Sequence, residues 1–570
     1  MKKAKKGIKL LVSRKVLVFM IFLITLGLVA PVIIFYSLGY RFDPKVGIFI
    51  YSGTVVLKPT PFDVNVFVDG EPLAKKQIDI INQSININGL KPGEYEIKVS
   101  KDGYQDWIKK TRVRSGIATE FWNVSLAPNN PSPKEVLEKS VAKSAFSSDK
   151  SKLAYFSKEE EFLAFYVRDD SGDHMIKKET ANERFPLEAG EIKWSNNNNW
   201  LIFSFKKGEE EKISLLQTEK LADPLIDLAE ILPQTENEIS EEVTPKSATE
   251  KETKKINSAP LYYTWDDGGD LYILSEGRIL SFRLKDIASL ASAKALANIN
   301  ENLNLNSNDN SNINENKNSI QRKTANANLN DNSKLNNLIA STSVADNSDG
   351  FAFCGSYICS ISANDRKIRI MSLTGNLVKE IDFATEMKSQ LKYQIFAYGD
   401  KLLAILDGEK RLFLWDETRF KENNVGPITK IGNDVTDIYF SDDGKKLLFK
   451  TENEAIVYFV RDWEVQPKHL AGEKEIVYSG KEKIDKIQWF YDYQNIFVSG
   501  KKEIILVELD GREGRNMPIF LKNEKEIFDF NYDGGEKKLW FTEGDNKENK
   551  KLKEIIFPES GSLFSNIIGN

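Results

Sequence analysis

The chain has 570 residues, with 79 Lys and Arg against 84 Asp and Glu and a net charge of −5. This length exceeds what one compact core usually holds, so we expect two or more domains. Seven basic residues lie within residues 1–15, and without them the net charge becomes −12. A body this acidic excludes nucleic acid as a partner, because such binding depends on neutralising phosphates.

The first predicted element is a transmembrane anchor over residues 16–40. This stretch contains no charged side chain and directly follows the basic residues 1–15. About 20 apolar residues suffice to cross a hydrocarbon core of ~30 Å. The positive-inside rule keeps the basic residues in the cytoplasm, so everything after the anchor is expected outside.

A cleaved signal peptide is the main alternative for this segment, because it has the same basic start. Its apolar region is shorter, and it needs small residues at the cleavage site. The best cleavage point follows Ala30, where Leu28 replaces the required small residue and Pro31 comes next. We therefore expect an uncleaved anchor. The length of the segment disfavours a third possibility, a buried core helix.

Short apolar runs separated by turn residues occupy residues 53–127. The run Val64–Val68 leads into Asp69-Gly70, a strong hairpin signal. The run Tyr95–Val99 alternates apolar and polar residues with the period of a strand. This pattern predicts a small β-sandwich, and none of its residues is expected to do chemistry.

The order of motifs in this stretch resembles that of a PEGA domain. The matching runs are Gly53–Pro61, Val66–Leu73 and Leu90–Tyr104. The resemblance implies a small β-sandwich on the outside of a prokaryotic cell, used as a spacer or an adhesion module. The chain departs from the family pattern at Ala74–Ile81, an insertion whose path the resemblance does not give.

A different repeat begins after residues 128–143, whose Asn, Pro and Ser residues predict a linker. Each repeat is an aromatic residue, a polar turn and an apolar strand. Most repeats are about 41 to 49 residues apart, the length of a four-stranded propeller blade. We therefore predict a β-propeller over residues 144–558, with repeats starting at Phe146, Trp194, Trp265, Phe353, Tyr398, Phe440, Trp489 and Tyr532.

The run Ser441–Phe449 resembles the blade motif of TolB-like and WD40-like propellers. It implies seven or eight blades, of which we favour eight. Two intervals are longer because they contain residues 235–258, rich in Glu, Lys, Thr and Ser, and residues 298–337, rich in Asn. Both compositions predict disordered insertions, with an Asn ladder on a strand as the alternative for the second.

The sequence offers no distinct catalytic, cofactor or metal site. It has no Gly-x-Ser-x-Gly elbow and no Gly-rich phosphate loop. Its two histidines, His174 and His469, lie in polar stretches that predict solvated loops. The clusters Asp266–Asp270 and Asp442–Gly444 lack calcium-loop spacing, and hairpin turns explain both. Most tryptophans recur at the blade repeats and are predicted to be core residues.

Cys354 and Cys359 are the only cysteines, and they flank a Gly-Ser-Tyr-Ile segment. On a hairpin they could lie opposite each other and form a disulfide in an oxidising compartment. The alternatives are two small buried hydrophobic residues, or part of a zinc site for which the chain has few other ligands. The sequence leaves the three possibilities open.

Together these patterns predict an all-β protein with an N-terminal transmembrane helix, a PEGA-like β-sandwich and a seven- or eight-bladed β-propeller. We expect a single-pass envelope protein, with its N-terminus in the cytoplasm, that binds or scaffolds a protein or a cell-surface glycan. No enzymatic activity, cofactor or metal is predicted, and the ligand-binding residues are not identified. The alternative is a glycan hydrolase with a carboxylate pair in the propeller channel.

Overall fold

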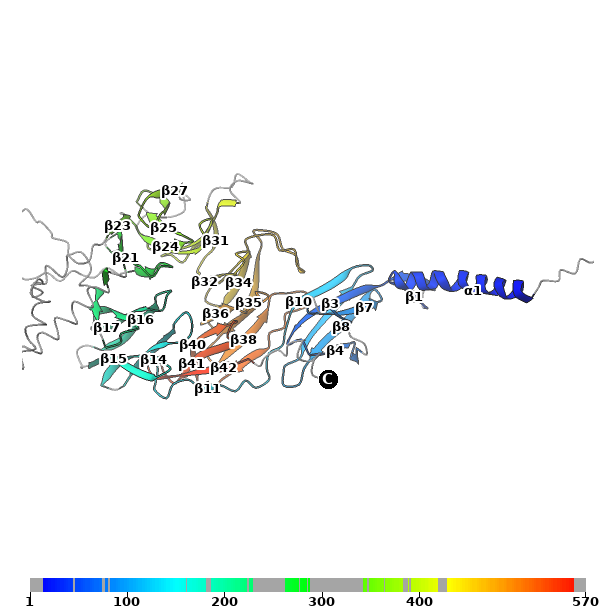
Figure 1. Ribbon diagram of the computed structural model, residues 1–570, viewed down its shortest axis with the longest axis horizontal. Helices are drawn as coiled ribbons and strands as arrows, with labels where there is room; N and C mark the ends of the chain where they lie inside the picture. The colour runs from blue at the N-terminus through cyan, green and yellow to red at the C-terminus, as the bar shows by residue number, and fades with distance from the viewer. Residues whose placement is uncertain are drawn as a thin grey trace, which may run out of the picture.

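One helix, a hairpin, a sandwich and a ring of sheets follow one another along the longest axis of the protein (Figure 1). The structure is a computed structural model. The insertions predicted at residues 235–258 and 298–337 lie outside the residues it describes, which are 14–44, 47–73, 77–79, 82–159, 161–180, 186–222, 225–228, 262–275, 277–283, 286–287, 342–345, 348–362, 364–382, 388, 391–418 and 428–557.

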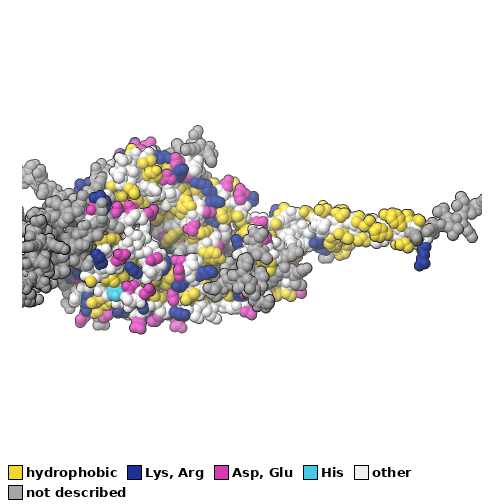
Figure 2. Space-filling model, in the orientation of Figure 1, with side chains coloured by type: hydrophobic (Ala, Val, Ile, Leu, Met, Phe, Trp, Pro, Cys, Tyr) yellow, Lys and Arg dark blue, Asp and Glu magenta, His cyan; other side chains and the backbone are white. Residues whose placement is uncertain are grey.

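The helix α1 (Arg14–Ser37) is apolar around its whole circumference, and Figure 2 shows the apolar side chains along its surface. Within Val16–Ser37 the most apolar stretch of 18 residues has a mean hydropathy of 2.9 and none of that stretch is buried, and the segment is long enough to cross a membrane. The helix ends three residues before Tyr40, the last residue of the predicted anchor. Gly39 has φ +93° and turns the chain, so that Tyr40 begins a strand.

A short antiparallel hairpin follows the helix. It consists of β1 (Tyr40–Asp43) and β2 (Ile48–Tyr51), which form their own two-stranded sheet. In its register Tyr40 pairs with Tyr51 and Phe42 pairs with Phe49, so these four aromatic side chains share one face.

The β-sandwich predicted for residues 53–127 is confirmed as two four-stranded sheets. The orders are β10-β3-β7-β6 and β5-β4-β8-β9, and only β10 and β3 run parallel. Val55, Ile97, Trp107 and Phe121 are buried in the core between them. The strands are β3 (Gly53–Thr60), β4 (Asn65–Val68), β5 (Glu71–Pro72), β6 (Gln77–Asp79), β7 (Ser84–Leu90), β8 (Gly93–Ser100), β9 (Trp107–Val113) and β10 (Ala118–Ser125).

The remaining described strands form eight antiparallel sheets of four strands each, which we number blades 1 to 8. Blades 1 to 4 are β12 (Lys143–Phe146), β13 (Leu153–Lys158), β14 (Phe162–Asp169) and β15 (Gly172–Thr180); β16 (Leu187–Trp194), β17 (Trp200–Lys207), β18 (Glu210–Gln217) and β19 (Ile226–Asp227); β20 (Tyr262–Trp265), β21 (Leu271–Ser275), β22 (Arg278–Phe282) and β23 (Thr342–Ala345); and β24 (Gly350–Cys354), β25 (Tyr357–Ser362), β26 (Lys367–Met371) and β27 (Leu377–Asp382).

Blades 5 to 7 have the same antiparallel order, and blade 8 is completed by a strand from before blade 1. Their strands are β28 (Tyr393–Tyr398), β29 (Leu402–Asp407), β30 (Leu412–Asp416) and β31 (Ile428–Gly432); β32 (Asp437–Phe440), β33 (Lys446–Lys450), β34 (Glu454–Phe459) and β35 (Lys474–Ser479); β36 (Lys486–Trp489), β37 (Asn495–Ser499), β38 (Glu503–Glu508) and β39 (Ile519–Lys522); and β40 (Glu526–Asp533), β41 (Lys538–Gly544), β42 (Lys550–Ile556) and β11 (Lys134–Glu135).

The eight blades close into a ring, which confirms the propeller and selects eight blades. Hydrophobic clusters join each blade to the next, and a cluster with Tyr155 of blade 1 and Trp540 of blade 8 joins the last to the first. The closing strand β11 lies within residues 128–143, for which the sequence predicts a linker. Two strand residues are too few to leave a periodic signal in the sequence.

Each aromatic repeat of the sequence lies at the turn between the first two strands of a blade. In blade 6 the Ser441 hydroxyl donates to Asp443 at 2.7 Å and accepts the Lys446 N–H at 2.9 Å, while Gly444 has φ +65°. Ser147 and Ser195 make the same contacts in blades 1 and 2. The polar residues of the repeat therefore build a turn.

Candidate functional site

A buried polar joint fastens the sandwich to blade 7 of the ring. Lys109 of β9 forms an ion pair with Glu508 of β38, and these side chains are 1 % and 2 % exposed. Glu508 also accepts hydrogen bonds from the Trp107 indole at 2.8 Å and the Asn516 backbone N–H at 2.9 Å. The Lys109 ammonium donates in addition to the Asp510 carbonyl at 2.9 Å. We call these five residues the buried joint.

The pKa of Glu508 lies above its ordinary value. Burial is the main cause because it penalises the charged carboxylate, and the ion pair with Lys109 lowers the pKa only partly. Buried charges are tolerated where ion pairing and hydrogen bonds offset the loss of water. The contacts to Lys109, Trp107 and Asn516 therefore allow this carboxylate to be buried between two domains.

Further polar contacts surround the buried joint. The Ser125 hydroxyl at the end of β10 donates to Asp492 at 3.1 Å and accepts from the Asn495 amide at 3.1 Å. On another side Arg512 donates to the Glu120 carbonyl at 2.7 Å, and its guanidinium lies 4.8 Å from the centre of the Phe121 ring. Contacts of this kind hold the sandwich in one orientation on the ring.

Glu508 and Asp510 are two buried carboxylates that the fold brings close together, since both contact the Lys109 ammonium. The hydrolase alternative requires two carboxylates facing an open channel with room for a sugar. This pair lies under the sandwich and is bound by Lys109, so it holds two domains together. A carboxylate pair elsewhere in the ring stays a prediction.

Both histidines contact other side chains. The prediction that His174 lies in a loop is wrong, because this residue belongs to strand β15. Its Nε2 is 2.9 Å from the Ser171 hydroxyl and 3.1 Å from Asp169. In a catalytic triad the acid and the serine contact different nitrogens of the imidazole. Here both contact Nε2, so the three residues form a turn network. Hydrogen bonding, chiefly from Ser171, lowers the pKa of Asp169 to about 2.

His469 is half-buried and stacks on Phe459, with ring centroids 3.9 Å apart. Its Nδ1 lies 3.1 Å from Glu473 and its Nε2 lies 3.5 Å from Glu475. The imidazole of His469 therefore packs against the outer part of blade 6 and is not surrounded by water.

The acidic clusters form turns, as predicted. The Asp266 carboxylate accepts the Asp270 backbone N–H at 2.8 Å, and Asp443 accepts the Ser441 hydroxyl. Burial raises the pKa of Asp266, which opposes the charge that a cation site needs. Among the described residues no group of three or more His, Cys, Asp or Glu side chains is arranged to hold a metal ion.

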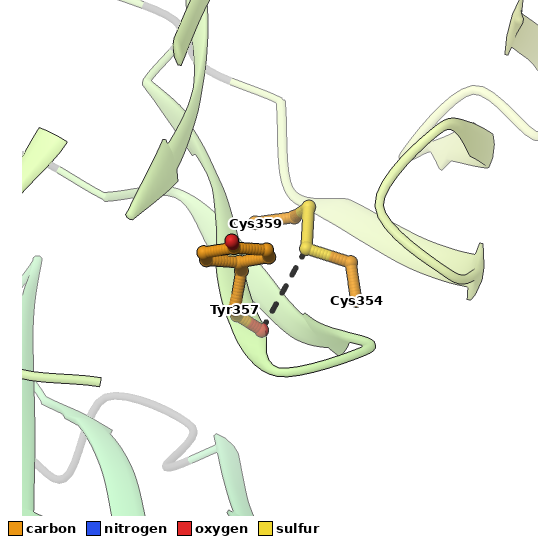
Figure 3. Close-up of a disulfide and its surroundings, with 3 residues drawn as sticks. All are labelled: Cys354, Tyr357 and Cys359. Carbon is orange, nitrogen blue, oxygen red and sulfur yellow. Dashed lines mark hydrogen bonds between the residues drawn. A yellow bond between two sulfur atoms is a disulfide. The ribbon is translucent and has the colours of Figure 1, made fainter. Parts of the chain in front are cut away.

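Cys354 and Cys359 form a disulfide within blade 4, shown with Tyr357 in Figure 3. The turn is only Gly355-Ser356, so Cys354 pairs in the sheet with Tyr357 and not with Cys359. Of the three possibilities that the sequence left open, the structure selects the disulfide on a hairpin. The two cysteines are diagonal neighbours on one face, with Cα atoms 6.0 Å apart, inside the range that a disulfide spans.

The tryptophans at the blade turns belong to the core, as predicted. Trp265 and Trp489 at the turns are buried, as is Trp540 within β41, and the Trp489 indole donates to the Tyr439 carbonyl of the preceding blade at 3.1 Å. Trp194 makes the equivalent bond to Ala145 at 3.0 Å. These rings join neighbouring blades, so they do not form a stacking platform for a sugar.

One cavity of about 370 Å³ lies where the chain between the sandwich and the ring crosses the end of β42. Pro128, Lys134, Glu554 and Phe557 are among its lining residues. Sequence reasoning did not find it, because its walls come from segments far apart in the chain.

Residues 52–129 match the family model of the PEGA domain, which confirms the resemblance found in the sequence. No curated protein matches the chain. Similar solved structures include the Dos1 propeller, with a TM-score of 0.41 and 10 % identity over 75 % of this chain and 94 % of that one.

Two further structures have comparable similarity. Sqt1 of Saccharomyces cerevisiae has a TM-score of 0.40 and 8 % identity over 75 % of this chain and 100 % of its own. A eukaryotic initiation factor has a TM-score of 0.40 and 9 % identity over 79 % of this chain and 90 % of its own. Similarity this low says nothing about a ligand, and the propeller is assigned from its own strand pairing.

Proposed function

We propose that this protein is a single-pass, membrane-anchored module of the cell envelope whose ring binds a protein or a cell-surface glycan outside the cytoplasm. The observation that carries the proposal is α1, a fully exposed apolar helix that continues through a hairpin into a β-sandwich. Such a surface is unfavourable in water and suits a lipid bilayer.

The end of α1 favours an anchor over a cleaved signal peptide. The helix continues past Ala30 to Ser37, and Phe35 of its last turns contacts Tyr40 and Phe49 of the hairpin. A peptidase cutting after Ala30 would have to bind an extended segment inside this helix. Pro31, on the far side of the cut, makes that site unfavourable as well.

The disulfide in blade 4 supports an extracytoplasmic ring. Cys354 and Cys359 are both fully buried, and such bonds persist in oxidising compartments. The seven basic residues within residues 1–15, the last two of which begin α1, support the same orientation, since the positive-inside rule keeps them on the cytoplasmic side.

The way in which the sandwich contacts the ring is consistent with a binding role for the ring. Among the described residues the sandwich contacts blade 7 and the adjoining loop of blade 6, and Ala127 at its end lies in one core cluster with blades 7 and 8. Blades 2 and 3 lie at the end of the molecule opposite α1 (Figure 1). The ring would thus present its distal blades to partners outside the cell, without catalysing a reaction.

The test is protease treatment of intact cells and of spheroplasts, followed by detection of a C-terminal tag. Digestion of the ring in spheroplasts, together with retention of the chain in membranes washed at high pH, is expected. Protection of the ring until the inner membrane is lysed, or release of a soluble chain shortened at its N-terminus, would contradict the proposal.

A further inference from the structure

Six aromatic side chains surround the point where α1 ends and the hairpin begins. They are contributed by the last turns of α1 and by both strands of the hairpin. We call them the aromatic collar: Phe35, Tyr36, Tyr40, Phe42, Phe49 and Tyr51.

The rings of the collar contact one another in a continuous chain. Tyr40 and Tyr51 have ring centroids 5.0 Å apart, and Phe42 and Phe49 are 5.4 Å apart across the hairpin. Phe35 joins them to the helix, at 5.4 Å from Tyr40 and 5.5 Å from Phe49. The hairpin is therefore seated against the end of the helix by aromatic contacts.

The collar is nevertheless largely exposed. Phe42, Phe49 and Tyr51 are 44 %, 36 % and 43 % exposed, and the adjacent Ile48 is 54 % exposed. A lone two-stranded hairpin is only marginally stable in water. An apolar surface of this kind marks a place where something other than water covers the protein.

The length of α1 determines what can cover it. Its 22-residue apolar span is about 33 Å long at 1.5 Å per residue, close to the ~30 Å of a hydrocarbon core. The collar begins in the last turns of this span and therefore lies at the outer boundary of the bilayer. Aromatic residues concentrate at that depth, because their rings are amphipathic or bulky and apolar.

We propose that the aromatic collar inserts into the lipid headgroup region of the outer leaflet and holds the hairpin flat against the membrane. The occupant is lipid, since the collar is continuous with the helix surface that the bilayer covers. The inference rests on the proposed function, because it requires α1 to span the membrane.

Hydrogen bonds link the hairpin to the sandwich, so the position of the collar in the membrane would also fix the position of the sandwich. The Ser52 N–H donates to the Gly39 carbonyl at 2.9 Å, and the Ser115 hydroxyl donates to the Tyr51 carbonyl at 2.7 Å. The Gly116 N–H donates to the Ser52 carbonyl at 3.2 Å. Because the buried joint fixes the sandwich on the ring, the collar would set the orientation of the whole ring relative to the membrane.

The test places a nitroxide label on the full-length protein in phospholipid nanodiscs and compares its accessibility to oxygen with that to a water-soluble nickel chelate. Both native cysteines are joined in the disulfide, so a single new cysteine is labelled. The variants are Phe42→Cys and Ile48→Cys in the hairpin, Ile21→Cys within α1, and Met175→Cys on the exposed part of the ring.

We expect the oxygen-to-nickel ratio at positions 42 and 48 to be several-fold higher than at 175, though lower than at 21. Ile48 makes none of the aromatic contacts, so it reports even if the change at Phe42 disturbs the hairpin. A ratio at 42 and 48 equal to that at 175, together with a high ratio at 21, would contradict the insertion of the aromatic collar into lipid but still support α1 as a membrane-spanning helix. A low ratio at 21 would contradict the proposal that α1 spans the membrane.

Discussion

The sandwich has one junction with the helix and hairpin and another with the ring, and different types of side chain form the two. Toward the helix, aromatic side chains such as Phe42 and Tyr51 are exposed. Toward the ring, the charged side chains of Lys109 and Glu508 are buried. Soluble proteins usually expose charges and bury aromatic rings. The difference teaches that the first junction has the side chains expected for the proposed lipid surface, whereas the second has the buried polar contacts of a domain interface.

The largest expected effect comes from breaking the buried joint. Lys109→Met leaves the Glu508 carboxylate buried without a cation, which costs about 3–5 kcal/mol. Hydrogen exchange of the β9 and β38 amides in the detergent-solubilised chain should show this loss as lower protection. Protection in the aromatic collar should change much less, because it does not use these charges.

An exposed ion pair provides the matched control. Lys468 and Glu464 are 2.9 Å apart, with side chains 67 % and 77 % exposed. Lys468→Met should change stability by less than about 1 kcal/mol. Equal effects of the two lysine substitutions would show that burial does not set the strength of the joint.

The second effect concerns Lys446 of β33 in blade 6. It is buried, donates to the Tyr493 carbonyl next to Asp492, and lies 4.0 Å from the Trp463 ring centre. Burial lowers the pKa of Lys446 to about 8. Between pH 8 and about 10.5 the unfolded chain holds a proton that the folded chain releases, so the free energy of unfolding should rise with pH.

The size of that rise is roughly 3 kcal/mol, from 1.36 kcal/mol for each unit of pKa. The free energy of unfolding should be measured by denaturation at several pH values for the wild type and for Lys446→Met. The rise should appear as a steeper dependence on pH in the wild type. The other titrating groups are the same in both proteins, so their contributions cancel in the difference. Parallel curves for the two proteins from pH 8 to 10.5 would contradict the lowered pKa.

The third effect is confined to blade 4 and should leave both junctions intact. Replacing Cys354 and Cys359 by serine removes a bond that closes a short loop, and chain-entropy arguments give about 2 kcal/mol. Thermal unfolding of the oxidised and the reduced wild type, with the double variant as reference, measures it. A reductant that lowers the melting temperature of the double variant would point to another cause.

The smallest effect tests the junction to the helix. Gly116 has φ +69°, and a Cβ there would lie 2.5 Å from the Tyr51 ring. Gly116→Ala should cost about 1–2 kcal/mol for the left-handed backbone and displace the ring of Tyr51. Faster exchange of the β2 amides, with β38 unchanged, is the expected result. Gly103→Ala is the control, because Gly103 has a similar φ of +83° and open space around it.

The periodic parts of this fold were predictable from the sequence. Trp265 and Phe440 mark blade turns because a propeller repeats one local unit, and local units leave a local signal. The closing strand at Lys134–Glu135 was not predictable, since it is two residues long and its partner β42 is more than 400 residues away. The end of the helix was not predictable either, because Tyr40 continues the uncharged run while already pairing with Tyr51.

The contacts between domains were not predictable at all. Lys109 alternates with exposed residues of β9, and nothing in its neighbourhood distinguishes it from the exposed lysine at position 110. Glu508 lies about 400 residues later, and only packing brings the two together. Such pairs leave no sequence pattern, because each residue alone is typical of a solvated strand edge.

The sequence by itself determined the parts of the protein: a basic start, an apolar span, a sandwich with PEGA motifs and a repeat of propeller length. These follow from local composition and periodicity, which act over tens of residues. Only the tertiary structure decided how the parts are joined, with eight blades closed by β11, a disulfide between diagonal neighbours and a sandwich held on blade 7. The physical reason is that closure and docking depend on contacts between residues hundreds of positions apart.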